Sequence, residues 1–401
     1  MTKQSPLRRL HPNVWILTAT SFLTDISSEM LTNLIPLFLA NVLGVRTAVV
    51  GLIEGLAETT ASLTKVYSGY LSDRLGKRKW LTVAGYGLST IAKPFLYFAN
   101  TWGWVIGVRF TDRLGKGIRT APRDALVAGS INQDQRGLAF GLHRAGDTAG
   151  AFLGLGIAAF IVWSTQSGAA ELSRRTFQIA VLASIIPAVL AVLVLGLGAR
   201  DVSTDGRSST PILSFKNIDG RFKIFLLVVM LFTLGNSSDA FIVLRAQERG
   251  LNVLHVMLML MTFNLIYAIL SGPLGALSDR IGRRKLIITG WLAYGLVYLG
   301  FALSRTGWQV WVLFMLYGIY YAATEGVAKA LIADLVSPQQ RGTAYGLYNA
   351  AVGLIALPAS LIAGLLWQGM GTWHGLGASA PFFFGAGLAL PAGLLFWFLV
   401  R

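Results

Sequence analysis

The stretch Gly69-Tyr-Leu-Ser-Asp-Arg-Leu-Gly-Lys-Arg-Lys79 recurs almost unchanged as Gly275-Ala-Leu-Ser-Asp-Arg-Ile-Gly-Arg-Arg-Lys285. A second pair follows in the same order, because Arg136-Gly-Leu-Ala-Phe-Gly-Leu142 returns as Arg341-Gly-Thr-Ala-Tyr-Gly-Leu347. A third, weaker pair precedes the other two motifs in each half: Ser27-Ser28-Glu29 and Ser237-Ser238-Asp239. The members of each pair lie about 205 to 210 residues apart. Three collinear matches indicate that a unit of half the chain has been duplicated.

The composition is that of a membrane protein. The 401 residues are 54% hydrophobic and 13% charged, with a mean hydropathy of +0.61, whereas soluble domains carry roughly 25% charged residues. Apolar runs recur along the chain at the length of about 20 residues that crosses a ~30 Å hydrocarbon core. Only helices and closed barrels satisfy their backbone there. Because the runs lack period-two alternation, the sequence predicts an all-α membrane protein.

Basic residues gather in alternate loops between the expected spans. The positive-inside rule places those loops, and with an even number of spans both termini, in the cytoplasm. The rule also explains most of the net charge of +16, so nucleic acid is not expected as a partner. The chain is expected in a bacterial inner membrane as a multi-pass protein. The expected spans are 14–43, 47–71, 80–100, 102–126, 137–164, 176–198, 222–247, 253–276, 286–304, 307–334, 341–368 and 379–400.

The duplication predicts two six-helix halves, residues 1–199 and 222–401. Residues 200–221 are rich in Ser, Thr, Asp and Gly and are expected to be a cytoplasmic linker. The sequence has no cysteine, which excludes Cys-based metal and redox sites. It also lacks the phosphate-binding loop motif, so ATP is not the expected energy source. We expect no cofactor, no metal and no enzymatic activity.

The repeated G-x-L-S-D-R-x-G-x-R-K element resembles the signature that the major facilitator superfamily carries between its second and third spans. Here it occupies that loop and the loop between spans eight and nine, and the resemblance covers essentially the whole chain. It implies two pseudo-symmetric six-helix bundles around a central cavity, in a secondary transporter that works by alternating access. The glycine-rich run of many exporters in the family is matched in span five by the glycines of residues 141–150, without the proline.

The repeated loop is expected to do more than fix the topology. Its first glycine lets helices approach closely and its second permits a tight turn, while its aspartate can cap a helix or pair with an arginine. The resemblance implies a conformational latch between cytosolic helix ends; the alternative is a purely topological anchor. The latch residues are expected to be Gly69, Asp73, Arg74, Gly76, Arg78, Arg119, Arg123, Gly275, Asp279, Arg280, Gly282 and Arg284.

Ionisable residues within the spans are the candidate functional residues, because each costs about 2.5–3.5 kcal/mol near the bilayer centre. In span four, Arg109, Arg113, Lys116 and Arg123 follow spacings that place them on one helical stripe. Arginine suits bidentate recognition of carboxylate or phosphate, although carboxylates of neighbouring spans are an alternative explanation for the stripe. The expected substrate-binding residues are Arg109, Arg113, Lys116, Arg144, Asn236, Asp239 and Glu325.

Carboxylates in spans that line the cavity are candidates for proton coupling, because their affinity for a proton changes with burial and with nearby arginines. Asp25 and Glu29 are the first choice, and Asp239 and Glu325 the second. The predicted function is proton-coupled export of a small polar or anionic solute or drug. Uptake of an organic anion by proton symport and lipid flipping on the same fold are the alternatives. The expected partners are that solute, protons and the lipid bilayer, and the chain is expected to act as a monomer.

Overall fold

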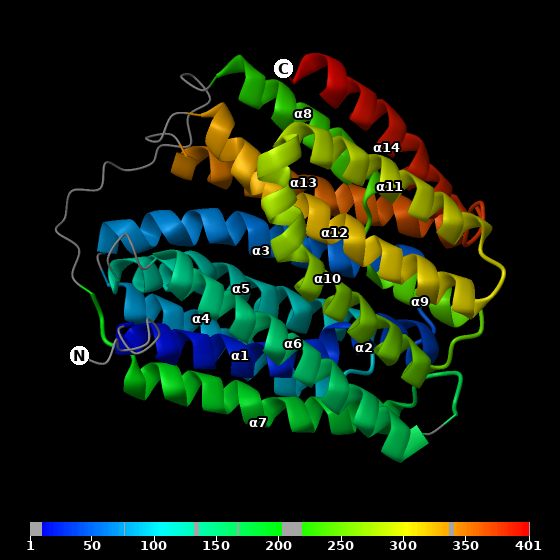
Figure 1. Cartoon of the computed structure of the whole chain (residues 1–401). Helices are drawn as coiled ribbons and strands as arrows, with labels where there is room; N and C mark the ends of the chain where they lie inside the picture. Colours follow the sequence, from blue (N-terminus) through cyan, green and yellow to red (C-terminus); the bar gives the residue numbers. More distant parts are fainter. Residues whose placement is uncertain are drawn as a thin grey trace. The chain divides into compact units, whose positions relative to one another are not determined.

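The computed structural model describes residues 10–75, 77–131, 136–166, 168–202, 219–336 and 341–400. Within these ranges every regular element is a helix (Figure 1), apart from an isolated bridge between Met370 and Trp373. Eight of the described helices are long and apolar enough to cross a membrane. Helix α5 falls outside that set because charged residues interrupt its apolar surface.

The bounds of the helices agree with the duplicated pattern of spans. In the first half they are α1 (Pro12–Thr32), α2 (Leu34–Leu37), the π-helix η2 (Phe38–Val42), α3 (Thr47–Leu75), α4 (Arg78–Ala92), the 3₁₀ helix η3 (Lys93–Phe98), α5 (Trp102–Gly129), α6 (Arg136–Gln166) and α7 (Arg174–Gly198). In the second half they are α8 (Gly220–Gly235), α9 (Ala240–Glu248), α10 (Val253–Ile281), α11 (Arg283–Leu303), α12 (Gly307–Leu335), α13 (Arg341–Gln368) and α14 (Ala380–Leu399). Most of the expected linker lies outside the described residues.

Two of the expected spans are interrupted. Span one breaks after Thr32, where Pro36 has no N–H to donate to the carbonyl four residues earlier. Span seven breaks between Gly235, the last residue of α8, and Ala240, the first residue of α9. The intervening polar residues compete with helical bonding, since the Ser238 hydroxyl accepts a hydrogen bond from the Ala240 amide at 3.3 Å. The continuous span expected over 222–247 is therefore two helices.

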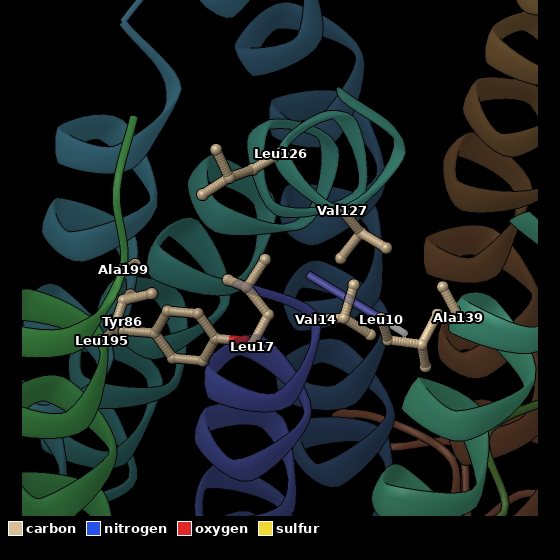
Figure 2. Packing of buried hydrophobic residues seen from close by; sticks show 9 residues of the cluster. All are labelled: Leu10, Val14, Leu17, Tyr86, Leu126, Val127, Ala139, Leu195 and Ala199. Carbon is tan, nitrogen blue, oxygen red and sulfur yellow. The ribbon is translucent and has the colours of Figure 1, made fainter. Parts of the chain in front are cut away.

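By their internal contacts the residues form two compact units. Unit 1 comprises Met1–Thr32, Leu63–Ile161 and Arg175–Pro211, and unit 2 comprises Asn33–Ser62, Val162–Arg174 and Ile212–Arg401. Figure 2 shows an apolar cluster of unit 1 in which side chains from α1, α4, α5, α6 and α7 converge. Its buried members are Leu10, Val14, Leu17, Tyr86, Leu126, Val127, Ala139, Leu195 and Ala199.

Glycines allow the helices of unit 1 to approach closely. A Cβ on Gly85 of α4 would lie 2.7 Å from the Arg119 amide nitrogen, and one on Gly115 of α5 would lie 2.6 Å from the Gly85 carbonyl oxygen. These two residues place the backbones of α4 and α5 in direct contact. On α6, the glycines at 146, 150 and 154 face three residues of α1 at the same four-residue spacing.

In unit 2 the first half of α3 packs against α13 through small residues. The Thr47 hydroxyl donates to the Gly364 carbonyl at 3.1 Å, and the Thr59 hydroxyl donates to the Gly353 carbonyl at 2.5 Å. Between them, Gly55 faces the backbone of Leu357. Small residues on both helices let the hydroxyls reach carbonyls of the neighbouring backbone, as is common between helices in membranes.

Candidate functional site

The buried charges of unit 1 are organised around α5. Arg119 is 6% exposed, donates through Nη1 to the Ser89 hydroxyl at 2.8 Å and lies over the Tyr86 ring at 4.4 Å from its centroid. The Ser89 hydroxyl in turn donates to the Asp112 backbone carbonyl at 2.9 Å. The tight crossing of α4 and α5 thus holds a guanidinium against an aromatic face, a favourable arrangement for a cation.

Asp112 lies among several cations. Arg113 approaches it at 4.0 Å, from Nε to Oδ2, and Lys93, Arg109 and Arg119 also act on it electrostatically. Arg109 is 3% exposed, so this predicted substrate residue is buried beside the aspartate. Asp25 offsets part of this charge because it interacts with Lys93 and Arg119. The four cations still outnumber these two carboxylates, and an excess of positive charge attracts anions.

Lys93 is a residue that our sequence reasoning missed. It begins η3, is 4% exposed, and its Nζ donates to the hydroxyls of Ser27 at 2.6 Å and Ser28 at 3.1 Å. Asp112 and Asp25 are the carboxylates that act on it electrostatically. The available signal was a lysine inside the expected span 80–100, which the sequence reasoning did not include among the ionisable residues of the spans.

The predicted proton-coupling residues of span one lie beside this cluster. Asp25 is half-buried on α1 and interacts electrostatically with Glu29, Lys116, Arg119 and Asp147. The structure therefore brings the first-choice carboxylates together with Lys116, a member of the predicted stripe. Lys116 itself is exposed within unit 1.

Two further groups of charged residues in unit 1 form local pairs. On α6, His143 Nδ1 lies 3.5 Å from Asp147 Oδ2, while the predicted substrate residue Arg144 is exposed. On α5, Arg123 pairs with Asp124 at 2.9 Å and donates to the Ser21 hydroxyl at 3.1 Å. The predicted stripe thus divides into buried and exposed cations with different partners.

In unit 2, tyrosines surround the break in span seven. Tyr317 of α12 donates to Asp239 Oδ1 at 3.1 Å and lies 3.3 Å from Asn236 Oδ1. From α11, Tyr298 reaches Asn236 Oδ1 at 3.4 Å and Tyr294 donates to the Gly235 carbonyl at 3.0 Å. The predicted substrate residues Asn236 and Asp239 therefore both lie beside the Tyr317 hydroxyl, where the backbone between α8 and α9 is not helical.

Glu325, the third predicted residue of unit 2, has a separate environment. It accepts a hydrogen bond from Tyr267 at 2.6 Å and lies 3.5 Å from Lys329 Nζ. Phe263 stacks with Tyr267 at 6.4 Å between ring centroids and meets Tyr321 edge-on at 5.6 Å. The carboxylate thus lies at one side of a group of aromatic rings, which sequence reasoning did not identify.

The repeated loop makes one contact in both copies. Arg78 donates to the Ala125 carbonyl at 3.1 Å, and Arg283 donates to the Ala330 carbonyl at 2.8 Å. Both arginines begin their helices, so the contact aligns Arg78 with Arg283. Arg284, which the sequence letters favour, instead donates to the Trp397 carbonyl and lies over its ring.

Several predicted latch residues can be placed and others cannot. Gly69 packs α3 on α5, where an added Cβ would lie 3.4 Å from Ala121, and Gly282 has the positive φ of 95° that a tight turn requires. At Gly275 an added Cβ would meet nothing within 4 Å, and Arg280 is exposed at the end of α10. Outside the described residues or side chains lie Asp73, Arg74, Gly76 and Asp279, and with them the expected pairing of Arg119 and Arg123 with Asp73.

Known proteins resemble this chain both in sequence and in fold. The family model of the Major Facilitator Superfamily matches residues 17–245 and 224–401. An uncharacterized MFS-type transporter of Methanocaldococcus jannaschii is 36% identical over 98% of this chain and 96% of its own. The multi-drug resistance efflux pump PmrA of Streptococcus pneumoniae is 24% identical over 79% of each chain. The solved nucleoside transporter NupG, in a structure of a point mutant at 14% identity, aligns over 97% of this chain and 100% of its own with a TM-score of 0.81. The predicted fold class is confirmed.

Proposed function

The chain belongs to the major facilitator superfamily of transporters, and from this premise we propose that it is a proton-coupled secondary transporter that exports a small polar or anionic solute or drug. The solute is moved by alternating access, driven by a proton gradient. In this proposal residues 1–199 and 222–401 act as the two bundles, joined through 200–221. The protein works as a monomer in a bacterial inner membrane with both termini in the cytoplasm.

The observation that carries the proposal is the surplus of cations in unit 1. Four of them act on Asp112, and three of these, Lys93, Arg109 and Arg119, are more than nine-tenths buried. Surplus charge within a membrane protein is expensive unless it serves a ligand or a coupling step. Arg109 and Arg113 are therefore proposed to bind the negative group of the solute, with Lys116 and Arg144 attracting it from exposed positions.

Proton coupling is assigned to Asp25 and Glu29, with Asp239 and Glu325 as the second choice. Asp25 supports this assignment because it interacts with both acidic and basic neighbours, Glu29, Asp147, Lys116 and Arg119. A proton added to Asp25 removes one negative charge from this group and so changes its attraction for an anion. Proton and solute are thereby linked without direct contact.

We propose export as the direction of transport because one relative is an efflux pump. One observation in the structure favours symport instead. The similar multi-drug efflux pump supports export. The proximity of Asp25 to the cations favours a second candidate, proton symport, because a proton on Asp25 strengthens anion binding and the two then travel together. The sign of this linkage, measured as anion affinity against pH, separates the two directions.

The latch is part of the same proposal. In both repeats the arginine that begins the helix after the repeated loop donates to a carbonyl near the end of the following long helix, at Ala125 and at Ala330. These contacts join two helix ends at the loop and are proposed to break when that end of the protein opens. Asp73 and Asp279 are proposed to take part.

The test is flux in liposomes containing the purified full chain under an imposed pH gradient, with radiolabelled phosphate, succinate and benzoate as solutes. We expect the gradient to drive movement of at least one of them by the wild type. Asp25→Asn or Glu29→Gln is expected to keep solute exchange and lose its dependence on the gradient. The control is Glu171→Gln, which removes an exposed carboxylate before α7. If both coupling variants keep the dependence, the coupled proton is not carried by this pair.

A further inference from the structure

Lys93 is a buried ammonium held by neutral partners. Its Nζ donates to the hydroxyls of Ser27 and Ser28 on α1, and among the described residues no carboxylate forms an ion pair with it. An ammonium has three donors, so two serines leave one donor for a further acceptor. A charge buried in this way is costly unless it is compensated.

The second repeat shows that the fold does not need this charge. Position 298, 205 residues later, holds a tyrosine. The same spacing relates Gly85 to Gly290, which each face the following long helix, and the N-cap Thr101 to the N-cap Thr306. Tyr298 lies 3.4 Å from Asn236 Oδ1, directly before the second Ser-Ser pair, whereas Lys93 donates to Ser27 of the first pair. A neutral hydroxyl therefore lies at the corresponding place in unit 2.

The other cations around Asp112 are also absent at the corresponding positions. Residues 314, 318 and 324, which correspond to Arg109, Arg113 and Arg119, are Phe, Gly and Thr. The charged groups that face Lys93 are Asp25 from α1 together with Asp112, Arg113 and Arg119 from α5. Unit 1 thus concentrates positive charge where the duplicated frame is neutral.

We propose that the Lys93 ammonium, with the Ser27 and Ser28 hydroxyls, binds the carboxylate or phosphate group of the transported solute. The inference rests on the proposed function and names the class of solute. A hydroxyl can donate as well as accept, so the serines that hold the ammonium in the empty site donate to the anion once it is bound. Because Lys93 is covered in this conformation, the anion reaches it when α1 and η3 separate during the transport cycle.

The test is anion binding by the purified full chain in detergent. Inorganic phosphate and acetate are titrated separately at constant ionic strength while the midpoint of thermal unfolding is followed. The wild type is expected to show a saturable rise with one of them, and the anion that acts identifies the class. For Lys93→Met the apparent Kd is expected to rise about tenfold or more, while the midpoint without anion stays level or rises because a buried charge is gone. Lys223→Met, a lysine in the first turn of α8, is the control and is expected to bind as the wild type does.

A second variant protects the test from misfolding. Lys93→Tyr introduces the side chain that unit 2 already carries at this position, and it is expected to fold and to lose the anion effect as Lys93→Met does. A wild type without a saturable response, or Lys93 variants that bind with wild-type affinity, would overturn the assignment. If the wild type binds the anion through Lys93 but shows no flux under a pH gradient, the proposed function fails and the binding site stands.

Discussion

The crossing of α4 with α5 in unit 1 and the crossing of α11 with α12 in unit 2 use the same small residue for different neighbours. Gly85 makes room for Arg119, and Gly290 makes room for Thr324. Glycine at the crossing brings the two helix backbones together in both units. The frame is therefore conserved between the repeats, whereas the residue that fills it is a buried cation in one and a neutral hydroxyl in the other.

The same contrast extends along both helix pairs. Unit 1 places Lys93 and Asp112 where unit 2 places Tyr298 and Tyr317. In unit 2 both tyrosine hydroxyls bond to Asn236, so polar contacts to the broken span are made without a charge on α11 or α12. A tyrosine can satisfy a buried acceptor at small cost, so contacts of this kind do not require the charges that unit 1 carries.

Removing the single central carboxylate of unit 1 is expected to have the largest effect. Asp112→Asn leaves four cations without their common anion and should lower the free energy of unfolding by about 3 kcal/mol. Asp124→Asn, whose side chain is 43% exposed beside Arg123, should cost under about 1 kcal/mol. Denaturant unfolding of the purified proteins in detergent measures both changes. Equal effects of the two variants would mean that the cluster around Asp112 is solvated and not a buried surplus.

The glycine crossing is expected to be the next most sensitive feature. Gly115→Ala places a Cβ 2.6 Å from the Gly85 carbonyl oxygen, and overpacking against backbone should destabilise the protein by about 1–3 kcal/mol. Gly107→Ala on the same helix meets nothing within 4 Å and should be neutral or stabilising, because alanine favours helix. The difference in unfolding midpoint between the two variants is the measurement. A tolerated Gly115→Ala would show that α4 and α5 can separate without loss.

The smallest effect is expected from a tyrosine hydroxyl of unit 2. Tyr317→Phe removes the hydroxyl that donates to Asp239 and lies beside Asn236 Oδ1, and should cost about 1 kcal/mol. Its neighbour Tyr321 makes ring contacts but no hydroxyl hydrogen bond within the described residues, so Tyr321→Phe should change the unfolding midpoint little. Thermal unfolding of both variants, side by side, tests the difference. A larger fall in the unfolding midpoint for Tyr321→Phe than for Tyr317→Phe would contradict the view that Tyr317 stabilises the break in span seven.

Hydropathy was sufficient to predict the eight described spans that are apolar over the thickness of a bilayer, whereas α5 carries too many charged residues for that signal. The duplication was visible because the repeated loop has nearly the same amino-acid sequence in both halves. The break in span seven was not predicted, since Asn236 to Asp239 are flanked by apolar residues and an average over a window hides four polar positions. The one-residue shift that pairs Arg78 with Arg283 also needed coordinates, because the letters alone favour Arg284.

The sequence identified the charged residues of the spans by their residue type, but it did not predict which groups they contact. Arg109, Arg113 and Asp25 stand out in a membrane sequence because ionisable groups are rare there. Which of them are buried together depends on the crossing of α1, α4 and α5, and the glycines that permit the crossing of α4 and α5, Gly85 and Gly115, lie on two helices whose contact the sequence does not reveal. Lys93 and the tyrosines of α11 and α12 were overlooked for the same reason. Their role depends on what their terminal atoms reach.

Arg245 has a mechanical consequence for the broken span. Its side chain is fully buried, and it donates to the carbonyls of Phe301, Ala302 and Ser304 and to the Ser379 hydroxyl. Helix α9 is thereby fixed to the end of α11. Between α8 and α9 the helix is interrupted, and the Asn236 amide donates to the Thr233 carbonyl three residues earlier, as in a turn. A turn of α8 about its own axis is absorbed at this joint. The α8 part of span seven can then rotate while α9 stays bound to the end of α11.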